Sequence, residues 1–207
     1  MLNTCENCGR YSVDKIISDT GDSMTCKFCG YTQAIKRLPL FIITGASGVG
    51  KSATSREMFK NKENVIVMES DILWNDAFNN PDNNYREYRE LWLRMCKNIS
   101  QGGKPIVHCG CSVPEQFENC VERRYFSDIH YLAIVCDDNI LTKRLHKRNV
   151  FNNEYINNSI SFNKWLKENA SLTNPPMTLL DNSNLEIEQV SGKVSTWIDS
   201  LLTNIRH

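Results

Sequence analysis

The distribution of apolar residues divides the chain at about residue 38. Beyond that point, short apolar runs alternate with longer segments in which apolar residues recur every three or four positions. The runs of strand length are 39–44, 64–69, 104–109, 130–136 and 177–180, and the helical segments are 51–60, 85–100, one that starts at Pro114, 139–148, 153–168 and 185–202. Strands and helices in alternation predict an α/β fold whose parallel sheet is covered by helices on both faces.

Two of these regions carry further expectations. The helix over 85–100 is amphipathic, and the residues at helical spacing, which we expect on its buried face, are Tyr88, Leu91, Trp92, Met95 and Ile99. The polar stretch 75–84, which contains Pro81, is expected to be a mobile loop.

The first 37 residues have little apolar core of their own and carry two Cys-x-x-Cys pairs. The pairs are Cys5 with Cys8 and Cys26 with Cys29; each is followed by a glycine, and seventeen residues separate them. Each pair can hold one side of a tetrahedral metal ion, and the spacer is long enough for a hairpin with its turn at 19–22. This spacing predicts a zinc ribbon that folds with a structural Zn²⁺. Two disulfides are the alternative, which we disfavour because no segment resembles a signal peptide.

Composition supports two unequal units, a zinc ribbon over 1–37 and a nucleotide-binding domain over 38–207. The 207 residues carry 24 Lys and Arg against 24 Asp and Glu, and the ribbon alone has five basic and four acidic side chains. Nucleic-acid modules usually carry a basic patch, so a nucleic-acid partner is possible but not favoured. No apolar run approaches the length that spans a bilayer, and we expect a cytoplasmic protein without a membrane partner.

The decisive motif follows the first strand of the second unit. Residues 45–52 read G-A-S-G-V-G-K-S, a phosphate-binding loop whose backbone N–H groups cradle phosphates at the start of a helix. Lys51 is expected to reach the β- and γ-phosphates, and the Ser52 hydroxyl to hold Mg²⁺. The residues expected to bind the nucleotide here are Gly45, Ala46, Ser47, Gly48, Val49, Gly50, Lys51, Ser52 and Ala53.

Three charged residues are candidates for the chemistry. Asp71 follows the second strand at the carboxyl edge of the sheet, where it can accept a proton from an acceptor hydroxyl or bind Mg²⁺ through water. Its alternative role is an ordinary helix N-cap. Arg144 and Arg148 lie four residues apart on one helix face and suit the charge of a transferring phosphoryl group, although basic runs are usually solvated surface.

This order of motifs resembles the P-loop kinases of small molecules, such as shikimate, gluconate, adenylate and nucleoside kinases. The resemblance covers roughly 38–202 and rests on the phosphate loop, the strand ending in S-D, the R-L-x-x-x-R helix and a late strand ending in D-N-S. It implies a five-stranded parallel sheet, ATP with Mg²⁺, and phosphoryl transfer to a small acceptor. By this likeness Asp71 contacts the acceptor, and Arg144 and Arg148 are lid arginines. The loop at Asp181, Asn182 and Ser183 packs near the adenine, and the helix over 85–100 forms the acceptor-binding insert.

The sequence departs from this kinase pattern at one point. The third strand ends in His108-Cys109-Gly110, where many relatives have an aspartate that organises magnesium.

Three functions remain as hypotheses, and the favoured one is a small-molecule kinase. The others are a nucleic-acid 5′-end kinase whose ribbon grips the strand, and a regulatory ATPase whose ribbon binds a protein partner. No N-K-x-D tetrapeptide is present, which disfavours a GTPase.

Overall fold

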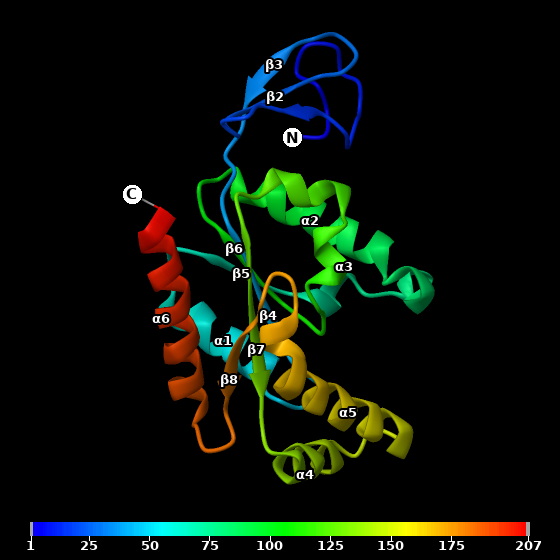
Figure 1. Cartoon of the computed structure of the whole chain (residues 1–207), viewed down its shortest axis with the longest axis vertical. Helices are drawn as coiled ribbons and strands as arrows, with labels where there is room; N and C mark the ends of the chain where they lie inside the picture. Colours follow the sequence, from blue (N-terminus) through cyan, green and yellow to red (C-terminus); the bar gives the residue numbers. More distant parts are fainter. Residues whose placement is uncertain (1, 206–207) are drawn as a thin grey trace.

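The computed structural model describes residues 2–205 and contains two sheets (Figure 1). The larger is a five-stranded parallel sheet in the order β5-β6-β4-β7-β8, with β4 (Leu40–Thr44) at its centre. Its other strands are β5 (Ile66–Glu69), β6 (Ile106–Cys109), β7 (Ile129–Val135) and β8 (Thr178–Asp181). The predicted fold class is therefore confirmed, with each of the five expected runs forming one strand.

Successive residues of β4 point to opposite faces of the sheet, and each face has its own core. Phe41 and Ile43 pack with side chains of α1 (Lys51–Asn61), α4 (Asp138–Arg148) and α6 (Ile187–Ile205). Leu40 and Ile42 pack on the other face with α2 (Arg86–Ser100), α3 (Glu115–Glu118) and the second half of α5 (Asn153–Asn169). Figure 1 shows α6 on one side of the sheet and α2 and α3 on the other. All five β4 residues are buried, as expected of a central parallel strand.

The segment between β5 and α2 is more regular than its polar sequence predicts. It contains three 3-10 helices, η1 (Ser70–Leu73), η2 (Asp76–Phe78) and η3 (Pro81–Asn83). The Asn75 side chain caps the start of η2 by accepting from the N–H of Ala77. Asn and Asp side chains bond to nearby backbone in this way, which is why an Asn-rich stretch can form tight turns.

The N-terminal segment forms a small antiparallel sheet at one end of the molecule (Figure 1). Its strands are β1 (Ile16–Ile17), β2 (Ser23–Thr25) and β3 (Thr32–Ala34). Met24 and Ile35 of this segment share a small core with Leu2 and with Tyr125 from the 3-10 helix η4 (Val121–Tyr125). The N-terminal sheet therefore packs on the rest of the chain through an apolar cluster.

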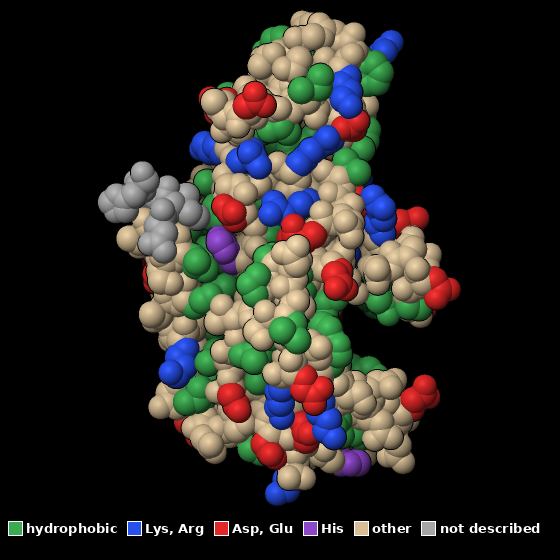
Figure 2. Space-filling model, viewed as in Figure 1, with side chains coloured by type: hydrophobic (Ala, Val, Ile, Leu, Met, Phe, Trp, Pro, Cys, Tyr) green, Lys and Arg blue, Asp and Glu red, His purple; other side chains and the backbone are tan. Residues whose placement is uncertain are grey.

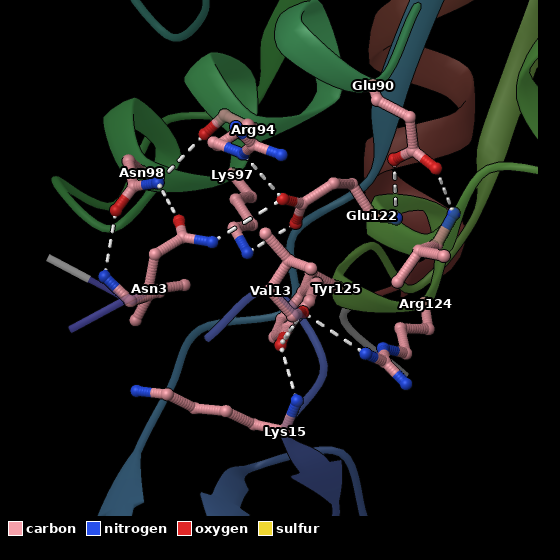
Figure 3. Close-up of polar contacts among 12 residues, drawn as sticks. Asn3, Val13, Lys15, Glu90, Arg94, Lys97, Asn98, Glu122, Arg124 and Tyr125 are labelled. Carbon is pink, nitrogen blue, oxygen red and sulfur yellow. Dashed lines mark hydrogen bonds and ion pairs between the residues drawn. The ribbon is translucent and has the colours of Figure 1, made fainter. Parts of the chain in front are cut away.

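Polar contacts extend this interface to α2 (Figure 3). Asn98 accepts from the N–H of Leu2 at 2.8 Å and donates to the side chain of Asn3. Glu122 forms ion pairs with Arg94 and Lys97, and the side chains of Lys97 and Glu122 are at most 1% exposed. The N-terminal segment thus contacts the C-terminal part of α2, through Asn98, and η4, through Glu122.

Among residues 2–205, no helix is both long enough and apolar enough to cross a bilayer.

Candidate functional site

The phosphate loop lies between β4 and α1 and needs its glycines. Gly45 has φ 152°, and a Cβ added there would lie 2.5 Å from the carbonyl oxygen of Ile134 on the neighbouring strand. Gly50 caps α1 in the left-handed region, with φ 110°. At Gly45 the close approach of β7 leaves no room for a side chain, and at Gly50 the positive φ disfavours any residue other than glycine. The loop geometry therefore fits the phosphate-binding motif.

Lys51 is the first residue of α1, and its ammonium group lies within the loop. Its Nζ donates to the carbonyl oxygens of Gly45 at 2.7 Å and Ala46 at 3.0 Å, and lies 3.3 Å from Sγ of Cys111. Ser52 is exposed at the start of the same helix. Both side chains face a cavity of about 380 Å³, here called the loop cavity.

A second cavity of about 790 Å³, here called the large cavity, adjoins the loop cavity. Four residues line both of them: Ser70, Asp71, Cys111 and Tyr155. The molecule is hollowed in this region, between the segment that precedes α2 and helix α5 (Figure 2). A group bound at the phosphate loop and a ligand in the large cavity would meet at these four residues.

Asp71 is exposed at this junction and is not a helix N-cap. It lies inside η1, whose N-cap residue is Glu69, and its carboxylate accepts from the Ser70 hydroxyl at 3.0 Å. Tyr88 donates from its phenol to the carbonyl oxygen of Ser70 and thereby holds this turn against α2. The geometry fits the expected role of Asp71 as a base for a ligand in the large cavity.

Glu69 is a second carboxylate that sequence reasoning did not identify. It is the last residue of β5, its Cα pairs with that of Cys109 on β6, and it lines the loop cavity. Strand β6 has no acidic residue at its end, but the neighbouring strand β5 has Glu69 at the corresponding position. The signal was present in the sequence, since Glu69 directly precedes Ser70-Asp71 at the end of a predicted strand.

The two arginines of α4 have different surroundings although they share a face. Arg148 is exposed and lines the loop cavity. Arg144 approaches the carbonyl oxygen of Val49 and Oδ1 of Asn182, both at 3.4 Å from Nη1. Arg144 therefore contacts the back of the phosphate loop, and Arg148 faces its cavity.

The loop after β8 supports the phosphate loop through Asn182 rather than Asp181. Asn182 is buried, and its Nδ2 donates to the carbonyl oxygen of Val49 at 2.6 Å. The exposed Asp181 instead accepts from the N–H and hydroxyl of Ser183, forming a turn. The loop that the resemblance places near the adenine thus contacts the phosphate loop, through Asn182.

Helix α5 adds a contact over the phosphate loop that the sequence did not indicate. The phenol of Tyr155 lies 2.6 Å from the hydroxyl of Ser47 in the middle of the loop. Its ring stacks on Phe151 with centroids 4.4 Å apart. Since Arg148, Phe151 and Tyr155 all line the loop cavity, the α4–α5 connection forms one wall of it.

Aromatic residues form much of the large cavity. Trp74, Tyr85, Tyr88, Tyr155 and Phe162 line it, together with polar side chains that include Asn79, Arg89, Ser112 and Gln116. Trp74 lines this cavity, whereas Trp92 is 1% exposed in the core. His108 is also buried, with its ring 4.6 Å from that of Trp92, which fits a strand residue rather than a catalyst.

The solved structures that resemble this chain share its fold. The tunicamycin resistance protein of Deinococcus radiodurans (TM-score 0.56, 15% identity) matches 79% of this chain and 96% of its own. A gluconokinase from Sinorhizobium meliloti 1021 has a TM-score of 0.54 and 14% identity, and the match covers 83% of this chain and 98% of the gluconokinase. A sugar kinase from Janibacter sp. HTCC2649 has a TM-score of 0.56 and 15% identity, and the match covers 79% of this chain and 95% of the sugar kinase. This chain has the P-loop kinase fold. No protein-family model and no curated protein matches the sequence.

Ahead of this P-loop kinase fold, the four cysteines of the N-terminal segment converge. The Sγ atoms of Cys5, Cys8, Cys26 and Cys29 all lie within 4.8 Å of one another. The Cys5–Cys29 and Cys8–Cys26 sulfur separations are 3.7 Å and 3.9 Å. Four sulfurs at about 2.3 Å from a tetrahedral Zn²⁺ would be about 3.8 Å apart, whereas a disulfide requires about 2.05 Å. The cluster fits a metal and not the disulfide alternative.

Backbone N–H groups favour thiolates in this cluster. The pKa of Cys5, Cys26 and Cys29 is lowered, in each case chiefly by a backbone N–H two or three residues ahead. The N–H of Arg10 acts in the same direction on Cys8, but burial and the three neighbouring thiols together raise the pKa of Cys8 to about 11. Mutual repulsion of this kind is relieved when a cation binds between the sulfurs.

Proposed function

We propose that this protein is an ATP- and Mg²⁺-dependent phosphotransferase that moves the γ-phosphoryl group of ATP to a hydroxyl or phosphate of a small nucleoside, nucleotide or sugar-like acceptor. The observation that carries this proposal is the meeting of the loop cavity and the large cavity at Asp71. Phosphoryl transfer between two bound molecules requires such a junction, because catalysis depends mainly on their relative position.

The residues around the junction supply the remaining functions. Backbone N–H groups of Gly48–Lys51 and the Lys51 ammonium hold the phosphates, and the Ser52 hydroxyl with the carboxylate of Glu69 holds Mg²⁺. ATP supplies the phosphoryl group, and Mg²⁺ offsets the negative charge of the phosphates. Asp71 takes the proton of the acceptor hydroxyl as that oxygen bonds to the γ-phosphorus and the bond to the ADP oxygen breaks.

The wall formed by α4 and α5 completes the loop cavity. Arg148 neutralises charge on the transferring group, while Arg144 and Asn182 fix the loop from behind. Tyr155 reaches over Ser47 and limits the access of water, which would otherwise hydrolyse ATP.

The test is ADP release from ATP and Mg²⁺ with and without pooled acceptors: nucleosides, nucleoside monophosphates, sugars and 5′-hydroxyl oligonucleotides. We expect release that depends on one acceptor pool and is abolished in Lys51→Ala. Wild-type turnover by Lys51→Ala would refute the phosphate-loop assignment. Slow release that no pool accelerates would favour a regulatory ATPase whose zinc ribbon binds a protein partner.

A second candidate function, a nucleic-acid 5′-end kinase, is supported by one feature of the N-terminal segment. Tyr11, Phe28 and Tyr31 are exposed there, and the Arg10 guanidinium lies 4.8 Å from the Phe28 ring centroid. Exposed aromatic rings with arginine can stack on single-stranded bases. Transfer to the oligonucleotide pool that is lost in Phe28→Ala would favour this function over the small-molecule kinase.

A further inference from the structure

Arg89 is an unusual residue in the wall of the large cavity. It lies on α2 and is 95% buried, with 5% of its surface exposed. Lys and Arg are almost never this buried without an ion-pair partner, because removing a charge from water is costly. Within residues 2–205, however, Arg89 forms no ion pair with a carboxylate.

The neighbours of Arg89 are neutral on every side. One terminal nitrogen, Nη2, donates to the carbonyl oxygen of Cys111 and to Oε1 of Gln116, both at 2.9 Å. The rings of Tyr88 and Phe117 each lie 5.3 Å from the guanidinium carbon. These contacts orient the guanidinium and offset part of its desolvation, but they supply no negative charge.

The remaining donors of Arg89 are unsatisfied by the part of the chain that the structure describes. Nε is buried without a hydrogen-bond partner, and Nη1 donates to no group of residues 2–205. Burial lowers the pKa of Arg89, but guanidinium groups stay protonated in proteins, so the positive charge persists. The side chain is therefore a fixed cation with free donors at the wall of a ligand-sized cavity.

We infer that the acceptor carries an anionic group, a carboxylate or a phosphate, which binds Arg89 in the large cavity. This inference rests on the proposed phosphotransferase function and specifies its acceptor class. Arg89 is held by the carbonyl of Cys111, and Cys111 lies at the junction with the loop cavity. An anion at Arg89 anchors the acceptor in the cavity and leaves its hydroxyl within reach of Asp71. The aromatic residues Trp74, Tyr85 and Tyr88 then cover the apolar body of the acceptor.

Pairs of acceptors that differ only in the anionic group test this inference on the wild-type protein. Suitable pairs are a nucleoside and its 5′-monophosphate, a hexose and the corresponding hexonic acid, and a polyol and its phosphate. Binding is measured by calorimetry and transfer by ADP release. We expect the anionic member of at least one pair to bind about 10- to 100-fold more tightly, the range for a hydrogen bond to a charged group. The pair that responds distinguishes phosphate from carboxylate.

Two variants of α2 assign the effect to Arg89. Arg89→Gln, and Arg89→Lys in case the glutamine variant does not fold, should raise the KM of the anionic acceptor 10-fold or more and change the KM for ATP little. Arg86→Gln is the control, because Arg86 is exposed one turn earlier and contacts the carbonyl of Asn119. A merely structural Arg89 would lower the thermal midpoint in its variants without changing the preference between paired acceptors.

The outcomes separate this inference from the proposed function. Equal binding of neutral and anionic members by the wild-type protein would overturn the anionic acceptor, even if transfer occurs. Anion binding that depends on Arg89 but supports no transfer would uphold the anion site and refute the phosphotransferase. Preference for a neutral acceptor that persists in Arg89→Gln would also overturn the inference.

Discussion

Asp71 lies where the two cavities meet, whereas Lys51 and Ser52 face the loop cavity. At the scale of single residues, this difference separates acceptor chemistry from nucleotide binding in the proposed function. A carboxylate at the junction can receive the acceptor proton without contacting the phosphate loop.

Asp71→Asn should therefore lower kcat by about 100- to 10,000-fold, the usual contribution of a general base, while ATP binding stays unchanged. Acceptor-dependent ADP release gives kcat, and calorimetry with a non-hydrolysable ATP analogue gives the affinity. Thr142→Ala, on the part-buried side of α4, is a control that should leave both quantities unchanged. Loss of ATP affinity in Asp71→Asn would show that this carboxylate acts mainly through the metal.

His108 gives a prediction on pH and stability. Burial, with a smaller effect of the Arg89 guanidinium, lowers the pKa of His108 from its ordinary 6.5 to about 3. The unfolded chain therefore binds a proton here over a pH range in which the folded protein does not. The stability contributed by neutral His108 is fully present above about pH 6.5 and is lost as the pH falls towards 3, by about 1.4 kcal/mol for each unit.

The measurement is urea unfolding of wild type and His108→Leu between pH 7 and pH 4. The free energy of unfolding should fall less steeply with acid in the variant, because leucine does not titrate. His146→Gln, at an exposed position of α4, should follow the wild-type slope. Parallel slopes for wild type and His108→Leu would contradict the prediction.

At the scale of elements, the sheet and most helices were predictable because their periodicities are strong. Apolar runs gave all five parallel strands, and the glycine-rich turn gave the start of α1. The buried face of α2 was predicted less well: Tyr88 and Trp92 are buried as expected, but Leu91, Met95 and Ile99 are half-buried. This helix is covered by the sheet on one side and by η4 and the N-terminal segment on another, and Lys97 is buried against η4.

Contacts across long sequence separations could not be predicted from periodicity. Tyr155 and Ser47 are 108 residues apart, and Asn182 is 133 residues from Val49. The sequence pattern places Arg89 on the polar side of an amphipathic helix, and only the fold shows that its side chain is buried at the wall of a cavity. The motif thus located the phosphate loop, while the residues of the large cavity are brought together only by tertiary packing.

The buried ion pair between α2 and η4 yields an element-scale prediction. Glu122→Gln leaves the Lys97 ammonium buried without a carboxylate, which should lower the free energy of unfolding by about 3–5 kcal/mol. Glu57→Gln removes the pair with exposed Lys60 and should lower the free energy of unfolding far less, because water screens the charges of an exposed pair. Urea unfolding at pH 7 measures both. The double variant Lys97→Met with Glu122→Leu should recover most of the lost stability, because no buried charge is then left unpaired. If it does not, the packing of these two side chains, and not the buried charge, causes the loss.

At the scale of the whole molecule, we propose that residues 1–37 form a zinc-dependent unit attached to the P-loop kinase fold. Cys8→Ser should abolish the binding of a single zinc ion to the reduced protein, because each knuckle supplies two of four ligands. Cys96→Ala, a buried cysteine outside the cluster, should keep the metal. Elemental analysis after gel filtration is the measurement, and reduced wild-type protein without zinc would refute the metal site.

Helix α2 joins the two ends of this molecule. Arg89 lines the large cavity, and about two turns further along the same helix Asn98 contacts Leu2 and Asn3 of the N-terminal segment. Trimming the chain to the kinase fold would therefore remove the N-terminal partners of Asn98, on the helix that carries Arg89, and of Tyr125 in η4. In the proposed function, the N-terminal segment thus supports the helix that lines the acceptor cavity, so a shortened protein should lose its affinity for the acceptor before it loses its affinity for ATP.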